Sequence, residues 1–111
     1  MHELAIAQNI IAIVEAEAKR QDFKKVVSIK LQIGELSGIV PECLYDFFPI
    51  ASRDTVAESA RITSEIIRAE VRCLSCGYEG KPDRGLCPSC GGSDIKLIAG
   101  REFFVDSIEV E

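Results

Sequence analysis

The sequence predicts an α+β fold, in which two helices pack on a three-stranded, mainly antiparallel sheet and a small module is inserted into the chain. Three observations lead to this prediction. Two segments carry apolar residues at helical spacing, three segments alternate apolar and polar residues, and four cysteines lie together between the second and third alternating segments. The expected domains are residues 1–70 plus 100–111 for the α+β unit and residues 71–99 for the inserted module.

Two segments have the apolar periodicity of amphipathic helices. In residues 4–20 the expected buried face comprises Leu4, Ala7, Ile11, Val14 and Ala18, flanked by Ile6, Ile10 and Ile13. The second helix is expected over residues 41–51, because proline is favoured in the first turn of a helix. Its expected core side is Leu44, Phe47, Phe48 and Ala51.

Three segments have the period of two that is typical of half-buried strands. Residues 27–33 are the clearest, with Val27, Ile29, Leu31 and Ile33 on the face that helices should cover. Residues 60–72 alternate as well, and the change of parity between Ile66 and Ile67 predicts a bulge or break. Residues 103–110 form the last strand. Residues 27–33 are also considered as an edge strand that would permit dimers or swapping.

Two Cys-x-x-Cys-Gly motifs separated by ten residues predict a structural zinc ribbon, with the ligands Cys73, Cys76, Cys87 and Cys90. Four thiolates suit tetrahedral Zn²⁺ and leave no position open for a substrate. The alternatives are a redox dithiol or a pair of disulfides, but a redox motif normally begins a helix in a βαβ context, which this Gly-, Pro- and Ser-rich segment does not offer. Cys43 is expected to be a small buried hydrophobic residue.

The composition argues against nucleic-acid and membrane binding. The formal net charge is −5, and a zinc tetrathiolate would make it more negative, whereas a nucleic-acid interface needs a basic face. No apolar run approaches the roughly 20 residues that span a bilayer, and the amino terminus lacks the features of a signal peptide. A cytoplasmic location is therefore expected, where thiolate ligands stay reduced.

The amino terminus is a second candidate metal site. His2 is the only histidine, and Met1 should be retained because the second residue is not small. The Met1 amine, the His2 backbone nitrogen and the His2 imidazole can form consecutive chelate rings, and Glu3 can supply a fourth ligand. Planar nitrogen donors favour Ni²⁺ or Cu²⁺ over Zn²⁺. The alternative is that His2 and Glu3 simply begin the first helix, where an acidic residue is favourable.

The opening residues 1–4, the segment Gly-Glu-Leu-Ser-Gly-Ile-Val-Pro-Glu at 34–42 and the two cysteine motifs resemble the hydrogenase nickel-incorporation protein HypA (HybF) family over the whole chain. The resemblance implies a metallochaperone that delivers Ni²⁺ to the large subunit of nickel-iron hydrogenase. It implies a HypB-type GTPase as partner and, in some organisms, service to urease maturation. The family's nickel ligand matches His2, its zinc ligands match the four cysteines, and Glu3 and Glu35 match acidic positions of the family.

Other function classes find less support in the sequence. An enzyme is not expected, because one histidine and a closed zinc site do not assemble a nucleophile, a base and an orienting group. The main alternative is a zinc-ribbon adaptor that binds proteins without transferring nickel. The chain is expected to be a monomer or a homodimer.

Overall fold

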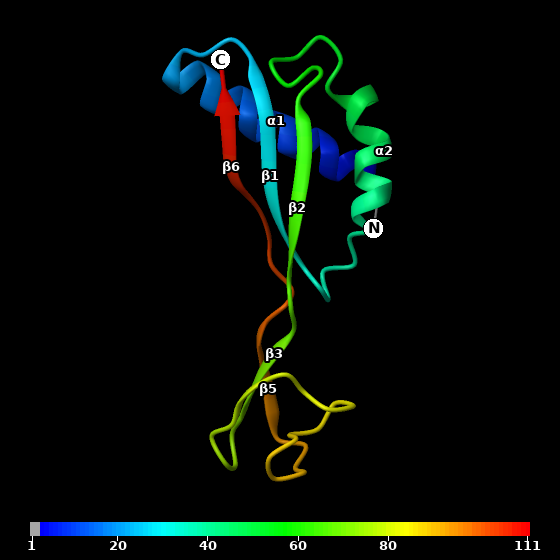
Figure 1. Ribbon diagram of the computed structural model, residues 1–111, viewed down its shortest axis with the longest axis vertical. Helices are drawn as coiled ribbons and strands as arrows, with labels where there is room; N and C mark the ends of the chain where they lie inside the picture. Colours follow the sequence, from blue (N-terminus) through cyan, green and yellow to red (C-terminus); the bar gives the residue numbers. More distant parts are fainter. Residues whose placement is uncertain (1–2) are drawn as a thin grey trace.

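The structure, a computed structural model, describes residues 3–111 and consists of an upper α+β part and a lower cysteine-containing part (Figure 1). The molecule is elongated, measuring 53 × 26 × 16 Å along its principal axes. Its elements, in chain order, are α1 (Glu3–Gln21), β1 (Val26–Gly34), α2 (Pro41–Ala51), β2 (Arg61–Ile67), β3 (Glu70–Cys73), β4 (Glu79–Gly80), β5 (Ile95–Ala99) and β6 (Phe103–Val110). The predicted α+β class with two helices and an inserted module is confirmed.

The upper sheet has the strand order β2-β1-β6. β1 is antiparallel to β6 but parallel to β2, so this sheet is mixed where a mainly antiparallel one was expected. The parallel pair arises because α2 connects β1 to β2 and carries the chain back to the end of the sheet where β1 began. β1 is the central strand, so the expectation that residues 27–33 form an edge was wrong. The edges are β2 and β6.

The buried face of β1 lies against both helices, as predicted. Ile29, Leu31 and Ile33 are completely buried, but at the start of the strand Val26 is buried instead of the expected Val27. The pairing with β6 shifts register between Val26 and Ser28, which turns Val26 toward the helices. The alternating pattern therefore predicted the buried face of β1 correctly from Ile29 to Ile33, but not at Val27, where the register shift changes which residue faces the helices.

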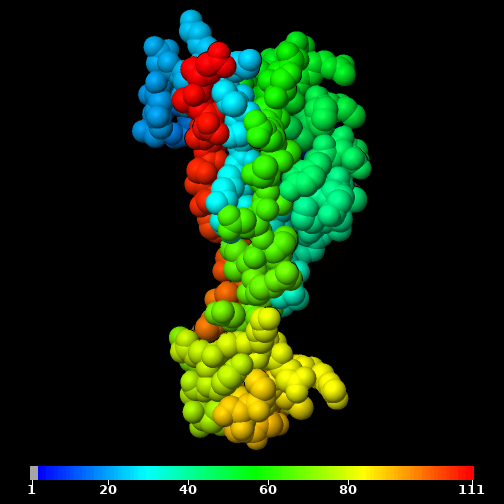
Figure 2. Space-filling model, viewed as in Figure 1, coloured from blue at the N-terminus to red at the C-terminus, as the bar shows by residue number. Residues whose placement is uncertain are grey.

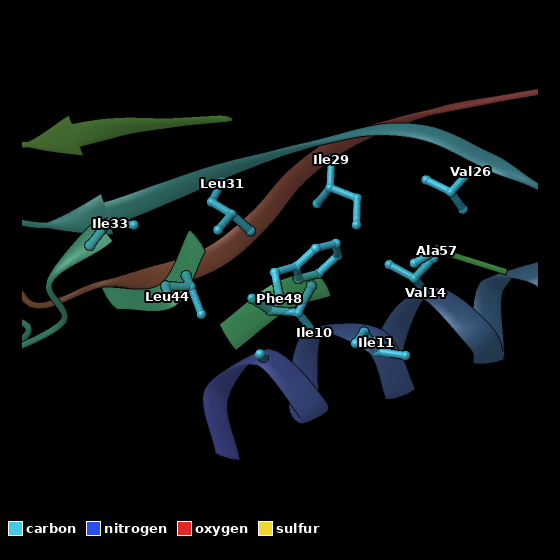
Figure 3. Close-up of a cluster of buried hydrophobic side chains, with 11 residues drawn as sticks. Ile10, Ile11, Val14, Val26, Ile29, Leu31, Ile33, Leu44, Phe48 and Ala57 are labelled. Atoms are coloured by element: carbon cyan, nitrogen blue, oxygen red, sulfur yellow. The ribbon is translucent and has the colours of Figure 1, made fainter. Parts of the chain in front are cut away.

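The two helices supply the other layer of this core (Figure 3). The buried residues of α1 are Ala7, Ile10, Ile11, Val14 and Ala18, and those of α2 are Leu44 and Phe48. Leu4, Ile13 and Phe47 were expected in the core, but each is more than a third exposed. Cys43 is exposed as well, so the expectation that it is buried was wrong. Residues 43 and 47 follow the helical periodicity but lie beside the narrow stripe that touches the sheet.

The two parts of the molecule are joined by a narrow region (Figure 2), where the strands cross (Figure 1). We call this region the neck; it comprises residues 34–36, 67–70 and 100–102. β2 ends at Ile67 and β3 starts at Glu70, so the expected break in this segment is present but lies at residues 68–69 instead of between Ile66 and Ile67. The backbones approach closely here, since a Cβ atom added to Gly34 would lie 2.3 Å from the carbonyl oxygen of Gly100. The Leu36 N–H donates to that same oxygen at 2.6 Å.

Below the neck, a second sheet has the strand order β4-β3-β5, with both pairings antiparallel. The module is thus entered through β3 and left through β5, as expected for an insertion between two strands. Within residues 3–111, no helix combines the length and the apolar character needed to cross a membrane.

Candidate metal centre

The sulfur atoms of Cys73, Cys76, Cys87 and Cys90 all lie within 4.8 Å of one another. Two of the separations are 3.7 Å, between Cys73 and Cys90, and 3.6 Å, between Cys76 and Cys87. A tetrahedral zinc ion with bonds of about 2.3 Å places its sulfur ligands roughly 3.8 Å apart. A disulfide bond is about 2.05 Å long, so these cysteines are not paired covalently. The four sulfurs fit a single tetrahedral cation.

Each Cys-x-x-Cys motif forms the same tight turn. The N–H of Gly77 donates to the carbonyl of Cys73 at 3.0 Å, and the N–H of Gly91 donates to the carbonyl of Cys87 at 2.8 Å. Both glycines have positive φ angles, +82° and +75°, that disfavour other residues. The glycine after each motif therefore lets the turn close.

Further backbone hydrogen bonds fix where the two turns begin. The N–H of Cys73 donates to Tyr78 at 2.8 Å, and the N–H of Cys87 donates to Gly92 at 2.9 Å. Cys73 is the last residue of β3, whereas Cys87 lies outside the strands. Cys73 and Cys87 are buried, while Cys76 and Cys90 are exposed. The turn at Cys73 therefore continues directly from the sheet, whereas the turn at Cys87 lies in the loop between β4 and β5.

The environment of the cysteines makes their acidities unequal. The backbone N–H groups of Cys76 and Ser75 lower the pKa of Cys73 to about 7. The N–H of Gly92 lowers the pKa of Cys90, but the three neighbouring cysteines raise it, and the resulting pKa is about 11. Negative charges this close oppose one another, so four simultaneous thiolates need a cation among them. The donor set and its electrostatics both fit a divalent metal ion.

The candidate nickel ligands Met1 and His2 lie outside the described residues. Glu3 is the first residue of α1 and is partly exposed, so it occupies the first turn of a helix. An acidic side chain is favourable at that position. The position of Glu3 agrees with the alternative that this residue begins the first helix. The nickel chelate of Met1, His2 and Glu3 stays a prediction.

Glu35, the other acidic position of the resemblance, lies in the neck. One of its carboxylate oxygens accepts the N–H of Ala69 at 2.7 Å, and the other lies 3.4 Å from the Arg68 guanidinium. The Ala69 hydrogen bond, followed by Arg68, lowers the pKa of Glu35. Glu35 therefore ties the end of β1 to the link between β2 and β3.

Glu102 has a similar place on the other crossing segment, and sequence reasoning did not single it out. Its carboxylate accepts the N–H of Gly100 at 2.6 Å. Its own backbone N–H and that of Gly100 lower its pKa. Its partner lies only two residues earlier, but neither spacing nor composition marks Glu102, because the hydrogen bond depends on the backbone conformation at Gly100, whose φ is +118°.

The comparison with known protein families decides the identity. Residues 1–110 match the family described as "Hydrogenase/urease nickel incorporation, metallochaperone, hypA". The chain belongs to the HypA family. The hydrogenase maturation factor HypA of Caldanaerobacter subterraneus subsp. tengcongensis is 39% identical over the full length of both chains, and that of Aquifex aeolicus is 34% identical over all of this chain and 98% of its own.

Solved structures of HypA proteins share this fold. The solution structure of the Ni metallochaperone HypA from Helicobacter pylori covers 99% of this chain with a TM-score of 0.72 and 24% identity, a likeness that concerns the fold alone. A second HypA solution structure covers the whole chain with a TM-score of 0.77 and 25% identity. The predicted family is confirmed, and with it a role in nickel incorporation during hydrogenase maturation.

Proposed function

We propose that this protein carries Ni²⁺ on its amino terminus and delivers it to the large subunit of nickel-iron hydrogenase, while a structural Zn²⁺ occupies the four-cysteine centre. The observation that supports the proposal best is the separation of donor types. Four sulfurs gather in one closed cluster below the neck, and the only histidine of the chain is at the amino terminus. Soft sulfur donors suit a resident zinc ion, whereas nitrogen donors suit nickel.

Zinc is the metal that we assign to Cys73, Cys76, Cys87 and Cys90. A bound zinc ion would cross-link the two turns and hold all four thiols in the ionised form. Four protein ligands would leave no open position, so the ion would stabilise the module without reacting. We accordingly propose residues 71–99 as a zinc-binding domain and residues 1–70 plus 100–111 as a nickel-binding domain.

Nickel is the transferred ion in this scheme, and we assign it to the Met1 amine, the His2 backbone nitrogen and the His2 imidazole, with Glu3 as a further ligand. α1 begins at Glu3, so the proposed chelate would continue directly into a 19-residue helix that packs on the core. A chelate on a rigid element loses less conformational entropy when it binds its ion than one on a free chain end.

Nickel titration of the zinc-loaded protein tests the assignment. His2→Ala is expected to lower nickel affinity by more than about 100-fold. Loss of a residue that only hydrogen-bonds to a metal ligand lowers metal affinity roughly 10- to 100-fold, and loss of the ligand itself should lower it further. An amino-terminal extension should act similarly by blocking the amine. Cys43→Ser is the control, since it removes an exposed thiol that is not among the proposed nickel ligands and should leave nickel affinity unchanged. Full nickel affinity in both amino-terminal variants would refute the site.

Acidity offers a second test of the same site. Free histidine and α-amino groups have pKa values of about 6.5 and 7.7–8.0, so protons compete with nickel near neutral pH. Nickel affinity is therefore expected to fall between about pH 7.5 and pH 6, while zinc, held by metal-stabilised thiolates, remains bound. A nickel affinity that stays constant over this interval would contradict a chelate that uses these nitrogens.

The proposed partners are a HypB-type GTPase, the hydrogenase large subunit and, in some organisms, urease maturation proteins, all in the cytoplasm. In this scheme the protein transfers an ion and is not itself an enzyme. The competing function is a zinc-ribbon adaptor without nickel transfer. Normal hydrogenase maturation by the His2→Ala variant would favour that adaptor, whereas loss of maturation with intact folding supports the nickel carrier.

A further inference from the structure

Strand β6 forms an exposed edge of the upper sheet. It pairs with β1 on one side, and none of the strands in residues 3–111 pairs with its other side. The C-terminal part of α1 extends beyond this edge, as the left of Figure 1 shows. The helix thus overhangs a position where a further strand of the sheet would lie.

A groove of about 380 Å³ lies between the overhanging helix and β6. Its walls are mainly apolar, with Ile13 and Val14 on α1 and Val105, Ile108 and Val110 on β6. Ile13 is 47% exposed and Val110 is 45% exposed, although both sit beside the core. An extended segment added to β6 would cover these side chains and pair with the free backbone groups of the edge.

The charge of β6 indicates what kind of segment fits. Residues 102–111 contain no cation, and their acidic residues are Glu102, Asp106, Glu109 and Glu111. Asp106 and Glu109 reach the solvent face of the sheet, where Asp106 lies 3.8 Å from Lys30 and Glu109 accepts a hydrogen bond from Ser28 at 2.9 Å. Pairing β6 with the β6 of a second copy would bring acidic residues together, which is destabilising. A segment with basic side chains would be attracted instead.

We propose that β6 and the groove beside it form a docking edge for an extended segment of another protein that alternates apolar and basic side chains. The segment adds as a strand next to β6, most regularly along Ser107–Val110, because a bulge at Asp106 interrupts the pairing of β6 with β1. Its apolar side chains enter the groove against Ile13 and Ile108. Its basic side chains point to the other face, toward Asp106 and Glu109.

A titration followed by NMR tests the docking edge on the full-length, zinc-loaded protein. The probe is a short blocked peptide that alternates valine and lysine, and the control peptide alternates valine and glutamate. The lysine peptide is expected to shift the amide signals of β6 and of residues 13–23, with little effect on α2 or the cysteine module. Shifts centred elsewhere, or equal binding of the glutamate peptide, would overturn the proposal.

Variants separate this edge from general attraction to an acidic protein. The double variant Asp106→Asn, Glu109→Gln is expected to weaken binding of the lysine peptide roughly three- to tenfold, as for two exposed ion pairs. The matched control is Glu42→Gln, Asp46→Asn on α2, which removes the same charge from the opposite side of the sheet. Ile13→Ser, at an exposed position outside the core, should also weaken binding. An equal loss in the α2 control would refute the site, as would self-association through β6 in sedimentation experiments.

Discussion

The α+β core and the cysteine module achieve order by different means. The core buries a cluster of eleven apolar residues between the helices and the sheet. In residues 71–99 the buried apolar side chains are only Val71, Cys73 and Cys87, and two of these are the proposed metal ligands. Burying one large aliphatic side chain contributes about 1.5–3 kcal/mol, so apolar burial can hold the core together but not the module. We therefore expect the module, but not the core, to depend on the proposed metal for its fold.

The lengths of the strands agree with this difference. β1 has nine residues and β6 has eight, whereas β4 has two and β3 has four. A unit of fewer than about 40 residues usually requires a metal, disulfides or oligomerisation to fold. The neck lies between the core and the module. Its segments are held together by backbone hydrogen bonds and by the carboxylates of Glu35 and Glu102.

Removing one cysteine ligand should have the largest effect. Cys76→Ser is expected to abolish zinc binding and to disorder residues 73–90, because structural zinc contributes roughly 10–16 kcal/mol in small zinc-dependent peptides. The signals of α1 and β1 should remain folded. Zinc content together with amide NMR spectra measures both parts, and Cys43→Ser is the control for loss of a thiol outside the centre. A module that stays ordered without zinc would contradict the expectation that its fold, unlike that of the core, depends on a metal.

Creating a cavity in the core should destabilise the core and leave the module intact, the reverse of the effect expected for Cys76→Ser. Leu31→Ala is expected to lower the free energy of unfolding by about 2–5 kcal/mol while leaving the zinc content unchanged. Ile50→Ala is the matched control, since Ile50 is 61% exposed and should cost less than about 0.5 kcal/mol. Urea unfolding monitored separately for each part gives the answer. Zinc loss in step with core unfolding would show that the two parts are not independent.

The neck should be sensitive to a single methyl group. Gly34→Ala would push a Cβ atom into the backbone of Gly100 and is expected to cost about 1–3 kcal/mol. Gly38→Ala is the comparison, because Gly38 has a φ of +82° but open space around it, so its cost is conformational and local. Only the Gly34 variant should shift the amide signals of the segment across the neck. Equal spectral changes in both variants would argue against tight packing there.

The smallest expected effect is a dependence on acidity. The pKa values of Glu35 and Glu102 are lowered in the folded protein, so their stabilising effect is complete above the ordinary value of 4.5 and is lost as the pH falls through the folded pKa. The Glu35→Gln, Glu102→Gln variant should therefore lose less stability on acidification below about pH 4.5 than the unmodified protein. Urea unfolding of the core across this range is the measurement, and Glu70→Gln is the control. An unchanged pH profile would contradict the role of the carboxylates in the neck.

Local patterns were sufficient to predict most elements of the core and the clustering of the four cysteines. The bounds predicted for α2 and β6 agree with the structure, since a proline starts the helix and a glycine precedes the strand by a few residues. The four cysteines were also found from spacing, because a tetrahedral site formed by two tight turns needs little information from elsewhere in the chain. Sequence was less informative about burial, because helical periodicity does not tell how wide a stripe the sheet will cover, and Phe47 and Cys43 were misplaced as a result.

By itself, the sequence determined which segments of the core are helices and strands, where the cysteine turns lie and to which family the motifs point, since these properties depend on neighbouring residues. Only the tertiary structure decided that β2 runs parallel to β1, that β1 is central and β6 an edge, and that Glu35 binds the Ala69 N–H in the neck. These outcomes depend on contacts between residues far apart in the chain. The same alternating pattern can serve a central strand or an edge, and Glu35 meets the Ala69 N–H only after the segments have crossed.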